Sequence, residues 1–354
     1  MRSAFPALQS RDYRLFLSGQ LISLVGTWMQ TVAQSWLVYR LTGSAALLGL
    51  IGFASQIPVF LLSPLGGVVA DRANRRRVLI GTQSAMMVLA FVLAAITLAG
   101  TVKVWHLFVL GSLLGVANAF DIPARQAFVI EMVGSREHLL NAIALNSSMV
   151  NGARVAGPAV AGVVVAAVGE GWCFLINAIS YVAVIGALAA MQVKPRRAHD
   201  AAVSAWESIV EGFQFGIRTA PVRALLLLLG LVSLMGMPYT VLMPVFADRV
   251  LHGGAHTYGL LLSMSGIGAL AGAMSLTLRR SVRGLGRWVG VSAIGFGACL
   301  LFFSFSRVVW LSAVLLVPAG FCMMVEMAAS NTLVQSMAPD RLRGRVMAMY
   351  SMMF

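Results

Sequence analysis

The sequence predicts an all-α membrane protein, on the basis of its composition, its apolar runs and the placement of its basic residues. Of the 354 residues, 59% are hydrophobic and 11% are charged, whereas soluble domains carry about 25% charged residues. A spanning helix needs about 20 mostly apolar residues, and ten runs meet this length. They cover residues 14–39, 46–70, 78–99, 105–127, 140–168, 171–192, 222–246, 257–278, 288–306 and 309–336.

The basic residues support this span count. The net charge is +14, and Lys and Arg concentrate on the cytoplasmic side of membrane proteins. With the N-terminus inside, 26 basic residues divide unevenly, because all but five lie in cytoplasmic segments. The exceptions are Arg40, Lys103, Arg249 and Arg307 outside, and Arg154 within a span. We therefore expect a multi-pass protein of the inner membrane with a cytoplasmic N-terminus, embedded in the lipid bilayer, and no nucleic-acid partner.

The first expected span carries polar and aromatic side chains among its apolar residues. Trp28, Gln30 and Gln34 are the most notable. Amides beside an aromatic ring are suited to lining a cavity for a bulky amphipathic substrate. They are equally suited to contacts between helices, and the sequence leaves both readings open.

The loop between the second and third spans reads GGVVADRANRRR. Gly66 and Gly67 allow another helix to approach closely, and Arg75 follows Asp71 by four residues, a spacing that permits an ion pair across one turn. The alternative is an ordinary basic cytoplasmic loop. The residues that we single out are Gly67, Asp71, Arg72, Arg75 and Arg76.

The fourth span ends in a second pair of opposite charges, Asp121 and Arg125, also four residues apart. These two side chains can pair with each other.

The fifth span contains Arg154, followed by Gly157, Pro158 and Gly162. A charged side chain at the centre of a spanning helix costs about 3 kcal/mol, so it must be paired or face water. Gly and Pro in this arrangement predict a kinked and tightly packed helix, although both residues are common in membrane helices.

A polar interval follows the sixth span and divides the chain. We expect a six-helix bundle over residues 1–193, a cytoplasmic linker over 194–221, and an incomplete second bundle over 222–354. The linker contains an amphipathic stretch, with Trp206, Phe213 and Ile217 on one face. This stretch is expected either to lie at the membrane interface or to pack under the bundle.

The second half holds one acidic residue within a span, Glu326. A carboxyl group in apolar surroundings can bind and release a proton near neutral pH, so Glu326 is our candidate for proton coupling or substrate binding. A structural acid bonded to a neighbouring helix is the alternative. Residues 346–354 begin an eleventh apolar run that stops after a few turns. The sequence therefore looks like a twelve-span plan that lacks its end.

The loop motif resembles the G-x-L-A-D-R-x-G-R-R motif of the major facilitator superfamily, with Val69 and Asn74 in place of the usual Leu and Gly. Asn tolerates the left-handed turn that Gly would occupy. The resemblance implies two pseudo-symmetric six-helix bundles. It also implies that Asp71 and Arg75 form a latch in the outward-open state, that Asp121 completes their charge relay, and that Gly157-Pro158 is an antiporter signature favouring export.

Longer segments, among them AFDIPARQAF and DRLRGRVMAMYSMM, resemble the enterobactin-exporter-like branch, which also holds macrolide and drug efflux proteins. This resemblance implies proton-driven export of a small molecule by alternating access. We expect a monomer without cofactor or metal, since no Walker, HExxH or GxSxG motif occurs, and no enzyme activity. A uniporter or importer on the same fold, and a non-transporting sensor, scaffold or inactive fragment, stay open as alternatives.

Overall fold

The computed structural model describes residues 6–133, 136–192, 205–277, 284–339 and 342–354. Every secondary-structure element in these ranges is helical, as the apolar runs predict. The chain forms two compact units. Unit 1 comprises Met1–His199 and Pro244–Leu260, and unit 2 comprises Asp200–Met243 and Leu261–Phe354.

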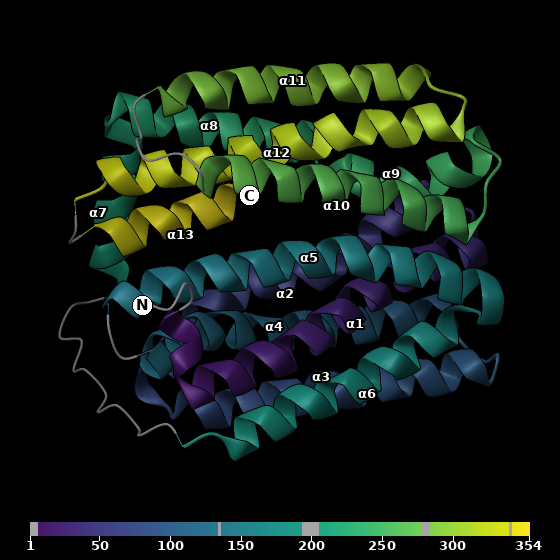
Figure 1. Cartoon of the computed structure of the whole chain (residues 1–354), viewed down its shortest axis with the longest axis horizontal. Coiled ribbons are helices and arrows are strands. Elements are labelled where there is room, and N and C mark those ends of the chain that lie inside the picture. Colours follow the sequence, from purple (N-terminus) through teal and green to yellow (C-terminus); the bar gives the residue numbers. More distant parts are fainter. Residues whose placement is uncertain (1–5, 134–135, 193–204, 278–283, 340–341) are drawn as a thin grey trace. The chain divides into compact units, whose positions relative to one another are not determined.

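Unit 1 is built mainly from six long helices that run lengthwise beside one another (Figure 1). Polar residues define where they begin. The Ser10 and Ser44 side chains accept hydrogen bonds from the first turns of α1 and α2, as N-caps do. Gly43 adopts the left-handed conformation that ends α1. The helices are α1 (Arg11–Thr42), α2 (Ala45–Arg72), α3 (Arg75–Leu98), α4 (Val104–Val133), α5 (Arg136–Val168) and α6 (Glu170–Ala190).

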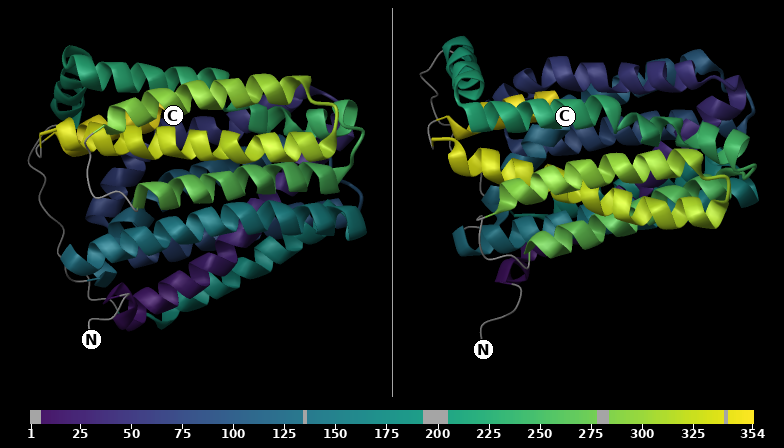
Figure 2. Two further views of the ribbon diagram at one scale, coloured as in Figure 1. Left: turned by 45° about the horizontal axis from the view of Figure 1, so that its top comes forward. Right: turned by 90° about the horizontal axis from the view of Figure 1, so that it is seen from above.

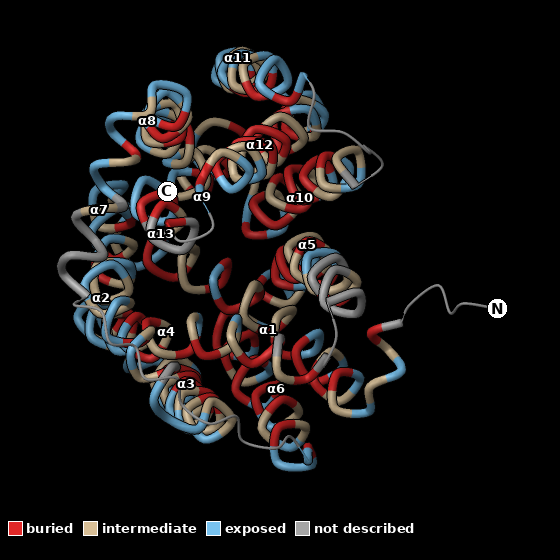
Figure 3. The backbone as a smooth tube through the Cα atoms, turned by 90° about the vertical axis from the view of Figure 1, so that its left-hand side faces the viewer, coloured by how far each residue is buried: buried red, intermediate tan, exposed pale blue. Residues whose placement is uncertain are grey.

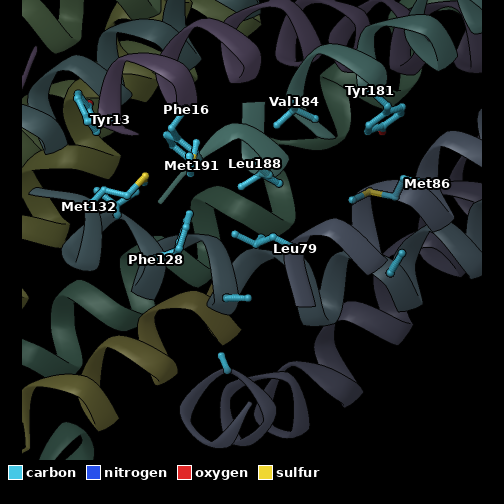
Figure 4. Close-up of a cluster of buried hydrophobic side chains, with 14 of the residues drawn as sticks. Tyr13, Phe16, Leu79, Met86, Phe128, Met132, Tyr181, Val184, Leu188 and Met191 are labelled. Atoms are coloured by element: carbon cyan, nitrogen blue, oxygen red, sulfur yellow. The ribbon is translucent and has the colours of Figure 1, made fainter. Parts of the chain in front are cut away.

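The core of unit 1 lies where α1, α3, α4 and α6 meet (Figure 4). Phe16 of α1 and Phe128 of α4 pack edge to face with ring centroids 6.5 Å apart. Leu79 of α3 and Leu188 of α6 are fully buried beside them. The Tyr13 hydroxyl donates to the carbonyl of Ala142 at 2.8 Å, so α5 is attached to the same core.

Unit 2 contains the remaining long helices and a short helix that turns away from them. α7 runs across the direction of α8 (Figure 2), and Gly216 of α7 packs against Met349 of α13. The helices after α6 are α7 (Ala205–Arg218), α8 (Ala220–Met235), α9 (Pro238–Val245), the π-helical turn η2 (Phe246–Val250), α10 (Ala255–Thr277), α11 (Leu285–Phe305), α12 (Val309–Met337) and α13 (Arg343–Met353). By residue number η2 and the start of α10 belong to unit 1.

The seventh expected span is interrupted between α8 and α9. Proline disfavours helical geometry in the residue before it and supplies no N–H, so Pro238 starts a new helix rather than continuing α8. A side chain at Gly236 would collide with Phe296 of α11. Glycine at this break therefore lets α11 pack closely against the end of α8.

Apolar side chains cover much of the molecular surface. α11 is the clearest case, with Ile294 75% and Phe305 79% exposed, and Figure 3, which views the helices end on, shows pale blue turns on this helix. Continuous apolar surface of this kind needs an apolar solvent. Because this surface lies on helices that are long enough to cross a bilayer, the solvent is lipid.

Nine helical segments of the described residues are long and apolar enough to cross a membrane. The chain is thus a multi-pass membrane protein. The tenth expected span, α1, does not meet the same criterion of composition, because Gln20, Gln30 and Gln34 interrupt its apolar residues. That α1 spans the bilayer stays a prediction.

Candidate functional site

The junction between α2 and α3 is fixed to α4 and α6 by two arginines in the first turn of α3. The Arg75 guanidinium donates to the carboxylate of Glu131 at 2.7 Å and to the carbonyl of Ala70 at 2.9 Å. Arg76 donates to the carbonyls of Leu188 and Ala189, both at 2.6 Å. These carbonyls belong to the last turn of α6, where backbone acceptors have no partner within the helix.

The other motif residues have distinct environments. Arg72 is exposed, whereas the Asp71 side chain lies outside the described residues, so the expected Asp71–Arg75 pair stays a prediction. A side chain at Gly66 would collide with the Ala119 carbonyl of α4, while Gly67 has no neighbour within 4 Å among the described residues. The close approach expected of both glycines is therefore made by Gly66.

The expectation of a left-handed turn at Asn74 is wrong. Asn74 is extended, with φ −68° and ψ 107°, and its side chain accepts from the Arg77 backbone N–H at 3.2 Å. It is the N-cap of α3. Asn is among the preferred residues at that position, so its presence here has a local structural reason.

Asp121 is fully buried and accepts several hydrogen bonds. Its carboxylate forms an ion pair with Arg125 one turn later on α4. The Thr82 hydroxyl and the Gln83 amide, both on α3, donate to its other oxygen at 2.9 and 2.8 Å. The structure thus brings Asp121 and Arg125 together, and it places the carboxylate of Glu131 beside Arg75.

α5 approaches α1 around the Gly-Pro segment. A side chain at Gly157 would collide with Trp28, and the guanidinium carbon of Arg154 lies 5.7 Å from the centre of the Trp28 ring. Gly162 lies against Gly259 at the start of α10. α5 continues through Pro158, although proline removes one backbone hydrogen bond from the helix.

The glutamines of α1 lie in contacts between helices. Gln30 is buried and accepts from the Asn177 amide of α6 at 2.7 Å. The Gln34 amide lies close to Gly111 of α4. Gln30 thus makes a contact between helices, which is one of the two roles that its sequence position allowed.

Glu326 of α12 is fully buried in unit 2, and neither of its carboxylate oxygens has a hydrogen-bond partner among the described residues. One turn further along α12, Ser330 is also fully buried. Its hydroxyl lies 3.0 Å from the hydroxyl of Tyr350 on α13, which donates to the Met327 carbonyl at 2.6 Å. A buried acid without partners is a candidate for reversible protonation.

Several residues in these clusters were not singled out from the sequence, and Glu131 and Tyr350 are two of them. Glu131 lies near the end of α4 and is 56 positions from Arg75, so no local spacing indicates the pair. Tyr350 lies in the last helix, and only the packing of α13 against α12 brings it to Ser330. The sequence shows that acidic and aromatic residues lie within apolar helices, but it does not indicate which residues they contact.

The buried charges and the apolar helices define a multi-pass membrane protein with polar groups inside its spans, as transport proteins have. Residues 2–354 match the family profile described as "Transmembrane secretion effector", and the chain belongs to this major facilitator family. It is a membrane transporter and not an enzyme. The resemblance to the enterobactin-exporter branch is confirmed.

Two curated relatives are matched over most of their length. The chain is 25% identical to a staphyloferrin A transporter of Staphylococcus aureus, covering 96% of this chain and 85% of the relative. It is 26% identical to an enterobactin exporter, EntS, of Citrobacter koseri, covering 96% and 80%. Among solved structures, the nucleoside transporter NupG matches 98% of this chain and 86% of its own with a TM-score of 0.72 at 15% identity, which shows the fold alone.

Proposed function

We propose that this chain exports a hydrophobic or amphipathic small molecule of the siderophore or drug type in exchange for protons, by alternating access. The match to a staphyloferrin A transporter and an enterobactin exporter over 96% of this chain carries the proposal. Both relatives handle siderophores by name, and the second exports its substrate.

Proton coupling is assigned to Glu326. Proton antiport requires a group that binds and releases a proton during the cycle. Glu326 is a fully buried carboxyl group, and neither of its oxygens has a hydrogen-bond partner within the part of the chain that the structure describes. Burial without a partner favours the neutral form and access to water favours the charged form. A change in water access would therefore change its proton occupancy.

Gating is assigned to the α2–α3 loop. Arg75 joins the loop to α4 through Glu131, and Asp121 joins α4 to α3 through Thr82 and Gln83. These bonds support movement of the cytoplasmic ends of α3 and α4 as one body. Asp71 would then make and break the latch to the second half of the protein.

The proposal includes an orientation and a span count. The N-terminus is placed in the cytoplasm and α1 is counted as a tenth span of the inner membrane. The distribution of basic residues supports this arrangement, because Arg72, Arg76 and Arg77 fall in one expected cytoplasmic loop while Lys103 is the only basic residue in the next loop.

Transport into inverted membrane vesicles tests the function. Vesicles with an acidic interior are expected to accumulate iron-free enterobactin, staphyloferrin A or a macrolide, and a protonophore is expected to stop the accumulation. Glu326→Gln is expected to abolish the proton-driven part. The matched control is Asp12→Asn, because Asp12 lies in the first turn of α1 and accepts an exposed hydrogen bond from the Gln192 backbone N–H at 3.2 Å.

The outcomes separate the alternatives. Movement that persists unchanged without a proton gradient would identify a uniporter or importer. Unchanged accumulation in Glu326→Gln would remove Glu326 from coupling. If none of the probes moves in vesicles that contain the folded protein, the export proposal fails and a sensor or scaffold takes its place.

A further inference from the structure

α5 presents a polar face in the first half of its span. The span covers residues 145–168, and Ser147, Asn151 and Arg154 lie on one side of the helix because they are separated by four and three residues. Ser147 is exposed, Asn151 is buried and Arg154 is half-buried. Polar and charged groups at this depth almost always face a protein interior or a water-filled path rather than lipid.

α1 completes this face with an aromatic ring. Gly157 allows α5 to approach α1 at Trp28, and Arg154 lies over the Trp28 ring at 5.7 Å. Thr31, almost one turn beyond Trp28, is exposed. We call Trp28, Thr31, Ser147, Asn151 and Arg154 the α1–α5 polar face.

The charge of this face comes from Arg154. The span over residues 145–168 contains no acidic residue and no other basic one, and residues 15–39 of α1 contain no charged residue at all. A ring holds a cation by its quadrupole and adds no negative charge. Arg154 is therefore the source of positive charge within these two helix segments.

We propose that the α1–α5 polar face binds an acidic oxygen group of the transported molecule, with the Arg154 guanidinium as its anion-binding group and Trp28 as its positioning residue. This inference rests on the proposed function and names the substrate class as anionic iron chelators. Hard metal ions are bound by charged oxygen ligands, so a chelator made for iron presents carboxylate or catechol groups when it is iron-free. A guanidinium matches such groups because its N–H donors fit two oxygens at once.

Binding to the full chain in nanodiscs of uncharged lipid tests the site. The probes are iron-free enterobactin, iron-free staphyloferrin A, citrate and the uncharged trimethyl ester of citrate. The loss of one charge-assisted hydrogen-bond pair corresponds to an affinity loss of about tenfold or more, which is expected for the anionic probes in Arg154→Gln. The trimethyl ester is expected to bind the two proteins equally.

Three further variants sharpen the test. Arg154→Lys keeps the positive charge but loses the planar pair of N–H donors, so an intermediate loss of affinity for the anionic probes is expected. Trp28→Phe keeps an aromatic ring but weakens the cation–π contact, so a smaller loss is expected. Arg307→Gln removes one positive charge from an exposed position and is the matched control, with unchanged binding of every probe.

The results distinguish this inference from the proposed function. If the parent protein transports a siderophore and Arg154→Gln binds it equally well, the site is wrong while the function holds. If the parent protein transports none of the probes but binds citrate through Arg154, the function fails and the anion site holds. Failure of the parent protein to bind any anionic probe overturns the site. Added anionic lipid that displaces the probes would identify a lipid headgroup as the ligand instead.

Discussion

Asp121 in unit 1 and Glu326 in unit 2 are both fully buried carboxyl groups within long apolar helices, but their surroundings differ. Asp121 is held by Arg125, Thr82 and Gln83. Glu326 has no hydrogen-bond partner at either oxygen among the described residues. A carboxylate held by several partners contributes to structure, whereas a buried acid without such partners is a candidate for reversible protonation.

The largest expected effect is the loss of charge at Asp121. Asp121→Asn keeps the shape of the side chain and an oxygen for Thr82 and Gln83, but leaves the charge of Arg125 without compensation. The Asp121 side chain is fully buried and that of Arg125 is 25% exposed, so we expect a loss of about 3 kcal/mol, at the low end for removal of one partner of a buried pair. We expect a markedly lower thermal midpoint in detergent.

The double variant Asp121→Asn/Arg125→Gln is the control for Asp121→Asn. It removes both charges and should regain part of the lost stability. A double variant that is no more stable than Asp121→Asn would show that the pair itself is not what Asp121 contributes.

The sequence was sufficient to predict those features of the two acids that depend on a single helix. The four-residue spacing of Asp121 and Arg125 was enough to predict a pair, and an acid in an apolar run was enough to select Glu326. The Thr82 and Gln83 bonds were not predictable, because they join α3 to α4 across 39 and 38 positions. Spacing within one helix is fixed by its geometry, while contacts between helices depend on the rotation and register of both.

The same distinction applies to the fold. Nine of the ten expected runs correspond to candidate spans, since length and hydropathy decide such segments. The break at Gly236 was missed because Pro238 lies within a continuous apolar run, and proline is tolerated in membrane helices where neighbouring helices compensate. The extent of α1 was correct to within three residues at each end, although its glutamines make its span assignment a prediction.

Close helix packing is expected to be equally important in the two units. Added Cβ atoms would collide with the Ala119 carbonyl at Gly66 in unit 1, and with the Ser265 carbonyl at Gly320 in unit 2. Overpacking of this kind costs typically about 1–3 kcal/mol, so Gly66→Ala and Gly320→Ala should both lower the thermal midpoint.

The matched controls are Gly81→Ala and Gly290→Ala, which have no neighbour within 4 Å among the described residues. They should be neutral or slightly stabilising, because Ala is a better helix former than Gly. If Gly66→Ala lowers the thermal midpoint and Gly320→Ala does not, the two units differ in helix packing as well as in the surroundings of their buried acids.

A smaller loss is expected at Glu131. The Arg75–Glu131 pair is partly accessible, with side-chain exposures of 19% and 12%, and water weakens such a pair. Glu131→Gln should lower stability by about 1 kcal/mol, measured as a thermal midpoint. Arg40→Gln changes a pair whose arginine is 54% exposed, and it should lower the thermal midpoint less. A larger loss in Arg40→Gln than in Glu131→Gln would show that burial does not set the strength of these pairs.

The smallest expected change in stability is that of Glu326→Gln, although the same substitution should remove proton-driven transport. Glutamine has the shape of glutamate, and no hydrogen bond is lost because neither carboxylate oxygen has one among the described residues. The thermal midpoint should therefore stay within the range of a neutral substitution, about 0.5 kcal/mol. Asp121→Asn is the matched acid-to-amide change, and it should impair folding and transport together. If Glu326→Gln instead unfolds the protein at a temperature as low as that of Asp121→Asn, Glu326 is a structural acid whose partner forms in another state of the transporter, and the contrast between the two units disappears.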